Sequence, residues 1–199
     1  AAVMSKRLLI LAGVLIPLTL IAAALVAPGT TDYAVISEGD GFEVRRYAPH
    51  VVAETTATGP FETADGLAFG LLVDYIQGRN EGGRNLPMTA PVTQQPLDTG
   101  AQQWLFQFVM SPEYLMSMLP RPADPAVTLR QVGEHTVAVR RYRGNWSEER
   151  YREQEQTLLA SLRDAAIQPV GNPLFARYNA PFVPGFLRRN EVIVEIRQP

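Results

Sequence analysis

Alternation of apolar and polar positions predicts the strands of this chain. Residues 42–47 and 51–58 alternate on either side of a short break, and residues 127–132 and 136–142 do the same. Each pair has the pattern of a β-hairpin. Further strands are predicted at 104–110, 173–178 and 190–197.

Helical spacing predicts two helices. Apolar residues recur every three or four positions between Phe61 and Gln77, and Gly78 follows as a helix terminator. A second helix is predicted after Asn145, which has the spacing of a capping box with Glu148. The apolar face of this second helix consists of Tyr151, Leu158, Leu162 and Ala165.

The segment between the first helix and the next strand is polar and contains several glycines and prolines. Residues 79–85 are polar and rich in glycine, which indicates a loop, and residues 86–94 are predicted to be extended. Pro87 and Pro91 lack the backbone N–H that an inner strand donates to its neighbour. Residues 86–94 are therefore predicted to form an edge strand or a bulged strand.

The order of these elements repeats along the chain. A shift of 85 positions superimposes strand pair on strand pair and helix on helix, and it aligns His50 with His135 and Gly59 with Gly144. Two ββαββ units predict one pseudo-symmetric α+β domain. In this domain a curved antiparallel sheet or open barrel is predicted, with two helices packed on it.

An uncharged apolar run occupies residues 8–27, long enough to cross a hydrocarbon core of about 30 Å. Lys6 and Arg7 precede this run and the next basic residue is Arg45, so the N-terminus is predicted to be cytoplasmic. A cleaved signal peptide is the alternative, but the length of the run favours a retained anchor. We expect residues 1–31 to be a single-pass inner-membrane segment in contact with lipid, and residues 32–199 to be a periplasmic domain.

Composition and charge narrow the possible chemistry. The 199 residues include no cysteine and only two histidines, which excludes a thiolate nucleophile and a cysteine-ligated metal cluster. The formal net charge of −2 argues against a nucleic-acid partner. No nucleophile-elbow, P-loop, dinucleotide-binding or zinc-protease motif occurs. The sequence therefore favours a binding protein over an enzyme.

Three stretches of the domain resemble the SOUL haem-binding proteins. The first begins with Phe-Glu-Val-Arg-Arg-Tyr at 42–47. The second runs from Asp-Tyr-Ile-Gln-Gly-Arg-Asn-Glu to Pro-Met-Thr-Ala-Pro-Val within 74–92. The third combines Arg-Tyr-Asn-Ala-Pro-Phe at 177–182 with Arg-Arg-Asn-Glu-Val at 188–192. The resemblance covers about residues 33–197 and implies a duplicated, distorted β-barrel flanked by two helices. Together with the predicted anchor, it identifies the chain as a bacterial, membrane-anchored member of the family.

The resemblance also implies that haem or another tetrapyrrole binds in an apolar groove beside the first helix. Such a ligand needs a flat apolar slot, polar groups for its propionates and, with iron, an axial ligand. His50 is the candidate metal ligand, because neutral imidazole ligates haem iron. The other candidate binding residues are Leu67, Gly70, Leu71, Asp74, Tyr75, Arg79, Met88, Phe106, Phe182 and Phe186.

Two glycines in the first predicted helix support this interpretation. Each of Gly66 and Gly70 costs roughly 1 kcal/mol relative to alanine within a helix, so a compensating contact is expected. Close approach of a flat ligand and tight packing of the helix on the sheet both satisfy that expectation.

Two other functions remain open. The apolar N-terminal segment contains Gly13 and Ala22-Ala23-Ala24, small residues that let membrane helices pack closely, which favours an accessory subunit of a larger membrane protein complex. A hydrolase or a cationic-ligand binder would need a buried carboxylate at the mouth of the groove. Glu43, Glu54 and Glu191 alternate outward in their strands and are predicted to be solvated.

Overall fold

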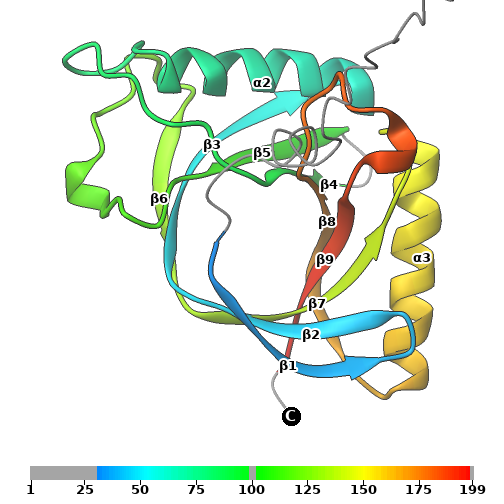
Figure 1. Ribbon diagram of the computed structural model, residues 1–199. Helices are drawn as coiled ribbons and strands as arrows, with labels where there is room; N and C mark the ends of the chain where they lie inside the picture. The colour runs from blue at the N-terminus through cyan, green and yellow to red at the C-terminus, as the bar shows by residue number, and fades with distance from the viewer. Residues whose placement is uncertain (1–30, 99–101, 198–199) are drawn as a thin grey trace, which may run out of the picture.

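The computed structural model describes residues 31–98 and 102–197. These residues form a nine-stranded antiparallel sheet with two long helices packed on it, which confirms the predicted α+β class (Figure 1). The helices are α2 (Phe61–Ile76) and α3 (Glu148–Asp164). The strands are β1 (Tyr33–Gly39), β2 (Phe42–Tyr47), β3 (His50–Thr58), β4 (Val92–Asp98), β5 (Gln103–Val109), β6 (Thr128–Val132), β7 (His135–Tyr142), β8 (Pro169–Arg177) and β9 (Asn190–Ile196).

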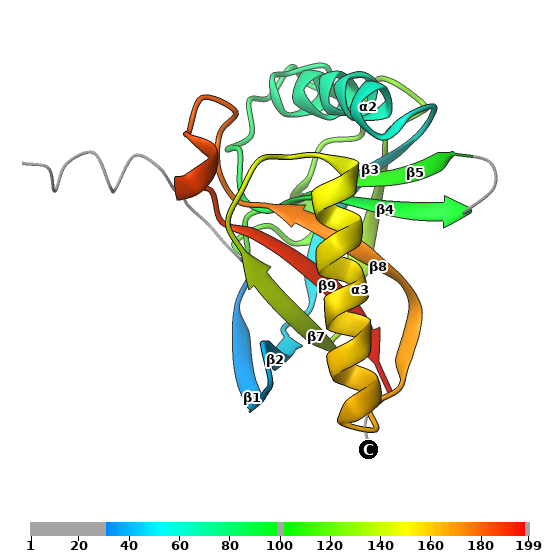
Figure 2. The same ribbon diagram turned by 90° about the vertical axis from the view of Figure 1, so that its right-hand side faces the viewer.

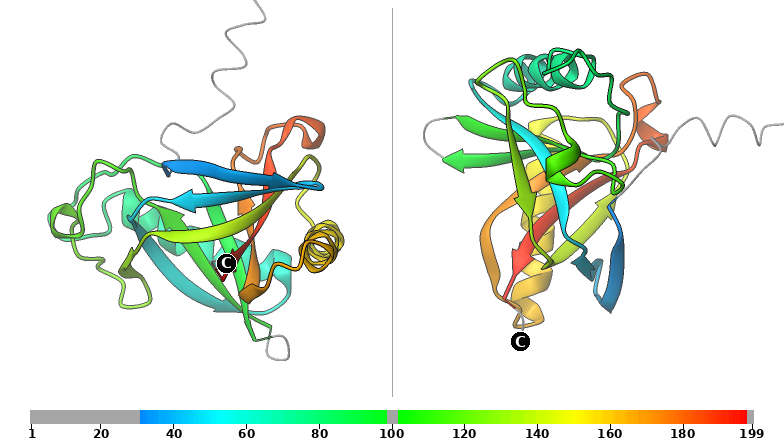
Figure 3. Two further views of the ribbon diagram at one scale, coloured as in Figure 1. Left: turned by 90° about the horizontal axis from the view of Figure 1, so that it is seen from below. Right: turned by 90° about the vertical axis from the view of Figure 1, so that its left-hand side faces the viewer.

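The sheet is strongly curved but open. Its strand order is β1-β2-β7-β9-β8-β4-β5-β3-β6, so β1 and β6 are its two edges. The curvature brings the two ends of the sheet toward each other, as the view from below shows (Figure 3). Among the described residues the predicted curved antiparallel sheet is therefore confirmed, whereas a closed β-barrel is not formed.

The two predicted hairpins are wrong, although their strands are present. β2 pairs with β1 and β7, whereas β3 pairs with β5 and β6. β6 and β7 likewise pair with other strands and not with each other. Alternation shows which face of a sheet a residue occupies, but it does not identify the partner strand. β1 was missed because all seven of its residues are exposed and give no alternating signal.

The predicted duplication accounts for the actual pairing. β2, β3, α2, β4 and β5 form one unit, and β6, β7, α3, β8 and β9 form the other. The first strand of each unit pairs with the second strand of the other unit, as β2 with β7 and β6 with β3. β4 and β8, the third strands of the two units, pair with each other between the two halves.

The strand that follows the first helix is an inner strand and not the predicted edge. β4 begins at Val92, after both Pro87 and Pro91, and it pairs with β5 and β8. Pro96 lies within β4, but pairing with β8 extends only from Val92 to Gln94. Pro96 therefore lies outside the β4–β8 ladder, and its missing backbone N–H removes no hydrogen bond from that ladder.

Both predicted helices form, and the start of the second is corrected. α2 ends at Ile76, just before Gly78, which has a φ of 106° and so terminates the helix as predicted. The N-cap of α3 is Ser147 instead of Asn145, because the Ser147 hydroxyl accepts a hydrogen bond from the Arg150 backbone N–H.

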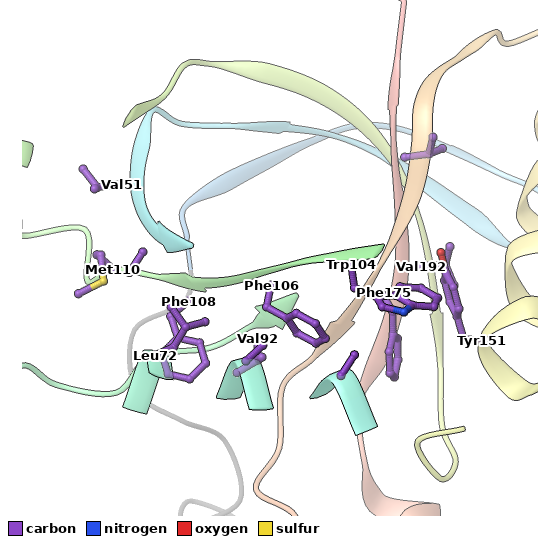
Figure 4. Close-up of a cluster of buried hydrophobic side chains, with 14 of the residues drawn as sticks. Val51, Leu72, Val92, Trp104, Phe106, Phe108, Met110, Tyr151, Phe175 and Val192 are labelled. Carbon is purple, nitrogen blue, oxygen red and sulfur yellow. The ribbon is translucent and has the colours of Figure 1, made fainter. Parts of the chain in front are cut away.

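The main core lies between the sheet and the two helices. α3 lies along β7, β9 and β8 (Figure 2), and α2 lies over β3 and β5 (Figure 1). Leu72 of α2, Phe106 and Phe108 of β5, and Phe175 of β8 meet in this layer (Figure 4). A smaller apolar cluster lies on the opposite, concave face of the sheet and includes Tyr47, Val137 and Ile193.

The predicted membrane segment, residues 8–27, lies outside the described residues. Among the residues that the structure describes, neither helix is long and apolar enough to cross a bilayer.

Candidate functional site

An apolar groove runs beside the first half of α2. Its volume is about 260 Å³. Four segments meet there: α2, the stretch that leads into β4, the turn before α3, and the chain after β8. The lining residues are Asp65, Gly66, Phe69, Met88, Thr89, Ala90, Val92, Trp146, Arg177, Tyr178, Asn179, Ala180 and Pro181. The lining is predominantly carbon, with charged groups confined to one side.

The charged side of the groove is formed by Arg177 and Asp65. The Arg177 guanidinium donates to the Asp65 carboxylate and stacks over the Trp146 ring, 5.2 Å from its centroid. Arg177 is buried, and its Nε atom has no hydrogen-bond partner within the described part of the chain. A buried N–H without an acceptor is costly. The Arg177 side chain therefore lies at the groove with one buried N–H unsatisfied.

Tyr178 joins the groove to a buried polar cluster on the concave side. Its hydroxyl donates to the Glu191 carboxylate at 2.6 Å, and the Arg189 guanidinium lies over its ring at 4.0 Å. Burial raises the pKa of the Tyr178 hydroxyl well above its usual value, and the charge on Glu191 adds to this. The phenol therefore stays protonated and fixes the ring that forms one wall of the groove.

Glu191 is fully buried, which corrects the prediction that it is solvated. β9 is paired on both sides, and the side chain of Glu191 lies on the concave face, away from water. Burial tends to raise the pKa of this carboxyl, but hydrogen bonding to Arg45 and the charges on Arg189 and Arg45 outweigh it and lower the pKa. The carboxylate is therefore ionised and already neutralised by two arginines. Glu43 and Glu54 are only partly buried in their strands.

The structure brings few of the predicted binding residues into the groove. Met88 lines it. Gly70 and Leu67 lie on the exposed surface of α2 near it, and Leu67 is 62% exposed. A Cβ atom added at Gly66 or Gly70 would meet nothing within 4 Å, so tight packing on the sheet does not explain either glycine. At Gly66 the missing side chain leaves the groove open.

Four other predicted residues lie on the far side of α2. Leu71, Asp74, Tyr75 and Arg79 surround a narrow crevice against residues 122–127, too tight to admit a ligand. Arg79 pairs with Asp74 at 2.8 Å, and the Tyr75 hydroxyl donates to the Pro120 carbonyl at 3.0 Å. Arg79 thus ties the loop after α2 to the helix, and Tyr75 ties the chain after β5 to the helix.

The three predicted phenylalanines occupy two environments. Phe106 is 1% exposed and belongs to the core beneath α2. Phe182 and Phe186 are 79% and 72% exposed, on the segment that follows the groove residue Pro181. Neither ring belongs to the core, and neither lines the groove itself.

His50 lies on the concave face, away from the groove. It lines a second pocket of about 390 Å³ that also includes His135. Thr93 of β4 and the preceding residue Pro91 line this pocket, whereas Val92 of β4 lines the groove, so the two cavities lie on opposite faces of the sheet. No group of three or more His, Asp or Glu side chains suited to hold a metal occurs in the described ranges.

Sequence reasoning missed Asp65, Phe69, Trp146 and Arg177. Phe69 had a usable signal, because it lies three positions after Gly66 and so on the same side of the helix. Trp146 and Arg177 come to α2 only through the packing of the second unit against the first. No local sequence pattern predicts the contact of Trp146 and Arg177 with α2.

Taken together, the open duplicated sheet and the apolar groove beside the first helix define a ligand-binding α+β domain. The chain belongs to the SOUL heme-binding protein family, because the sequence model of that family matches residues 29–195. It is 31% identical over 165 residues to human heme-binding protein 2, covering 79% of this chain and 80% of that protein. Mouse heme-binding protein 2 is 30% identical over 148 residues, 71% of each chain.

Solved structures share the fold at much lower identity. The C-terminal domain of EcmrR superimposes with a TM-score of 0.62 at 10% identity, covering 84% of this chain and 99% of that one. A hydrolase from Listeria innocua gives a TM-score of 0.55 at 9% identity, covering 81% and 94%. At such low identity these likenesses establish the fold alone.

Proposed function

We propose that this protein binds haem or a related tetrapyrrole in the groove beside α2 and holds it for transfer. The observation that carries the proposal is the groove itself, a carbon-lined slot kept open by Gly66 with the Arg177 guanidinium on its charged side. Membership of a haem-binding family supports the ligand class. The same membership favours binding over catalysis.

The groove residues fit a tetrapyrrole that makes apolar contacts through the face of its ring. A volume of about 260 Å³ lies near the lower end of small-ligand pockets, so a macrocycle would extend beyond it. The exposed rings of Phe182 and Phe186 would then cover the protruding part. The Arg177 guanidinium would donate to a propionate at the charged side of the slot.

The groove offers little to ligate iron. Among its lining residues only Met88 and Tyr178 belong to the side-chain types that ligate haem iron, and the Tyr178 hydroxyl is engaged by Glu191. Bound haem would therefore have few or no protein side chains as axial ligands of its iron. Binding that relies on the ring face suits reversible loading and release.

The test is a Soret-band titration of the full chain in mild detergent with ferric haemin and with metal-free protoporphyrin. Saturable one-to-one binding of both is expected. Gly66→Phe fills the groove and should weaken binding at least tenfold, equivalent to about 1.4 kcal/mol. Gly66→Ala is the control, because it also raises helix propensity but adds only one methyl group. Equal affinity for both variants, or absence of binding by the wild type, would overturn the proposal.

We further propose that residues 8–27 anchor the domain in the inner membrane with the domain in the periplasm. The distribution of basic residues supports this orientation. Ala27 and Thr31 are four residues apart, a span of at most roughly 14 Å, so such an anchor would hold the domain close to the bilayer surface. A reporter that folds only in the periplasm, fused to the C-terminus, should be active. Activity of a cytoplasm-specific reporter at that position would contradict the orientation.

A second candidate function is docking onto a larger membrane complex. The exposed Phe182 and Phe186 favour it, since aromatic rings of this exposure are common in interaction surfaces. Migration of the native protein as an isolated chain in a mild-detergent native gel would count against this alternative.

A further inference from the structure

The two histidines of the chain lie side by side on the concave face. In the β2–β7 ladder Tyr47 pairs with His135, and in the β3–β6 ladder His50 pairs with Val132. These pairings place the bend before β3 against the bend before β7. The imidazole rings of His50 and His135 are 5.7 Å apart, and the Tyr47 ring stacks on His135 at 5.7 Å.

Both imidazoles are held in the same tautomer when neutral. Nδ1 of His50 lies 2.9 Å from the Ala48 carbonyl oxygen, and Nδ1 of His135 lies 2.9 Å from the Gly133 carbonyl oxygen. A carbonyl oxygen only accepts, so Nδ1 must carry the proton in each ring. The lone pair is therefore on Nε2 in both histidines. A backbone carbonyl that fixes the ring through Nδ1–H is the usual arrangement of a metal-ligating histidine.

The surroundings of the pair favour a cation. The pocket of about 390 Å³ that the two rings line also contains Glu134 and Glu195. Of the basic residues near it, Arg130 is bound by Glu54 at 3.0 Å through two oxygen atoms. Arg46 approaches Glu134 only at 3.9 Å, between exposed side chains.

We propose that His50 and His135 together bind a divalent transition-metal ion such as Cu²⁺ or Zn²⁺ through their Nε2 atoms. Imidazole is a preferred ligand of both ions, and Cu²⁺ binds nitrogen sites most strongly in the divalent series. No third His, Asp or Glu completes a cluster with them in the described residues, so water or a small ligand would occupy the remaining coordination positions. The site is separate from the groove beside α2, because the two cavities lie on opposite faces of β4.

The test titrates the full chain in mild detergent, carrying no histidine tag, with Cu²⁺ alone and with Zn²⁺ alone. Calorimetry should give one site for each ion. Electron paramagnetic resonance of the Cu²⁺ form should show hyperfine coupling to two nitrogen ligands. Because the chain has only these two histidines, the His50→Asn, His135→Asn double variant removes every imidazole.

Asparagine is chosen because its side-chain N–H can still donate to the carbonyl that Nδ1 contacts now, so the bends keep their hydrogen bonds. Each single substitution should weaken binding at least tenfold, as removal of a ligand costs no less than removal of a supporting residue. Identical affinity of the wild type and the double variant would overturn the proposal. The nitrogen coupling of the wild type alone decides the matter if a variant fails to fold, since a spectrum with no imidazole nitrogen refutes it.

Discussion

Arg45 of β2 and Glu191 of β9 form a two-point ion pair across the intervening strand β7. The Arg45 guanidinium donates to the two carboxylate oxygens of Glu191 at 3.0 and 3.2 Å, and both side chains are buried. Tyr178 and Arg189 complete the cluster around the same carboxylate. The pair therefore ties the strand that opens the first unit to the strand that closes the second, directly beside a wall of the groove.

Replacing Glu191 with glutamine should lower the free energy of unfolding by about 3 kcal/mol. The substitution leaves the buried Arg45 without its main counter-charge, and breaking one partner of a buried pair has this order of cost. Glu43→Gln is the control, because Glu43 also contacts Arg45 but is partly exposed, and its loss should cost less than about 1 kcal/mol. Urea denaturation at pH 7 measures both; equal effects would contradict the assigned role of the buried pair.

The same pair predicts how stability depends on pH. The pKa of Glu191 is lower in the folded than in the unfolded protein, mainly because Arg45 and Arg189 outweigh the effect of burial. The contribution of Glu191 is therefore present above the unfolded pKa, near 4.3, and is lost as the pH falls through the folded value. The stability difference between the wild type and Glu191→Gln should shrink below roughly pH 4. A difference that grew on acidification would show that the carboxyl is protonated in the native state.

Tyr75→Phe should destabilise the protein by about 1 kcal/mol and leave tetrapyrrole binding unchanged. The Tyr75 hydroxyl donates to the Pro120 carbonyl and fixes the chain after β5 against α2, on the side away from the groove. Burial raises the pKa of Tyr75 to about 12, so the donor persists throughout the neutral range. Thermal unfolding and the haemin titration measure the two effects. A marked loss of haemin affinity would instead place Tyr75 in the binding site.

Local periodicity was sufficient to predict both helices, the duplication and the strands with an alternating pattern, because each depends on the face that a residue presents. It missed β1, whose residues are all exposed, and the prolines near β4 led to the wrong prediction of an edge strand. It could not predict that β2 pairs with β7 instead of β3, since strand partners are chosen by packing between the two units. The groove shows the same division. Gly66 and Met88 belong to signals along the chain, whereas Arg177 and Trp146 reach α2 only through the assembled fold. The proximity of His50 to His135 follows from the exchanged pairing and was equally hidden.

Phe182→Ser with Phe186→Ser should leave the free energy of unfolding within about 0.5 kcal/mol of the wild type, because both rings are exposed. If the rings cover a bound macrocycle, the same double variant should bind haemin several-fold more weakly. Leu97→Ser is a control, because Leu97 is a partly exposed apolar residue of β4 that does not line the groove. Unchanged haemin affinity in the double variant would remove the two rings from the binding site and favour a protein partner for that surface.

Asp65→Asn should strengthen the binding of tetrapyrroles that carry propionates. In the ligand-free protein Asp65 accepts a hydrogen bond from the Nη2 atom of Arg177, so it competes with a ligand carboxylate for that donor. Removing the charge of Asp65 frees Arg177, and a charge-assisted hydrogen bond gained on binding is worth about 1.5 kcal/mol, or roughly tenfold in affinity. Octaethylporphyrin is the matched probe, because it has the same macrocycle without carboxylates and its affinity should not change. An equal gain for both porphyrins would mean that the substitution acts on the shape of the groove, and a loss for the propionate-bearing ligand would mean that Asp65 positions Arg177 for binding instead of competing for it.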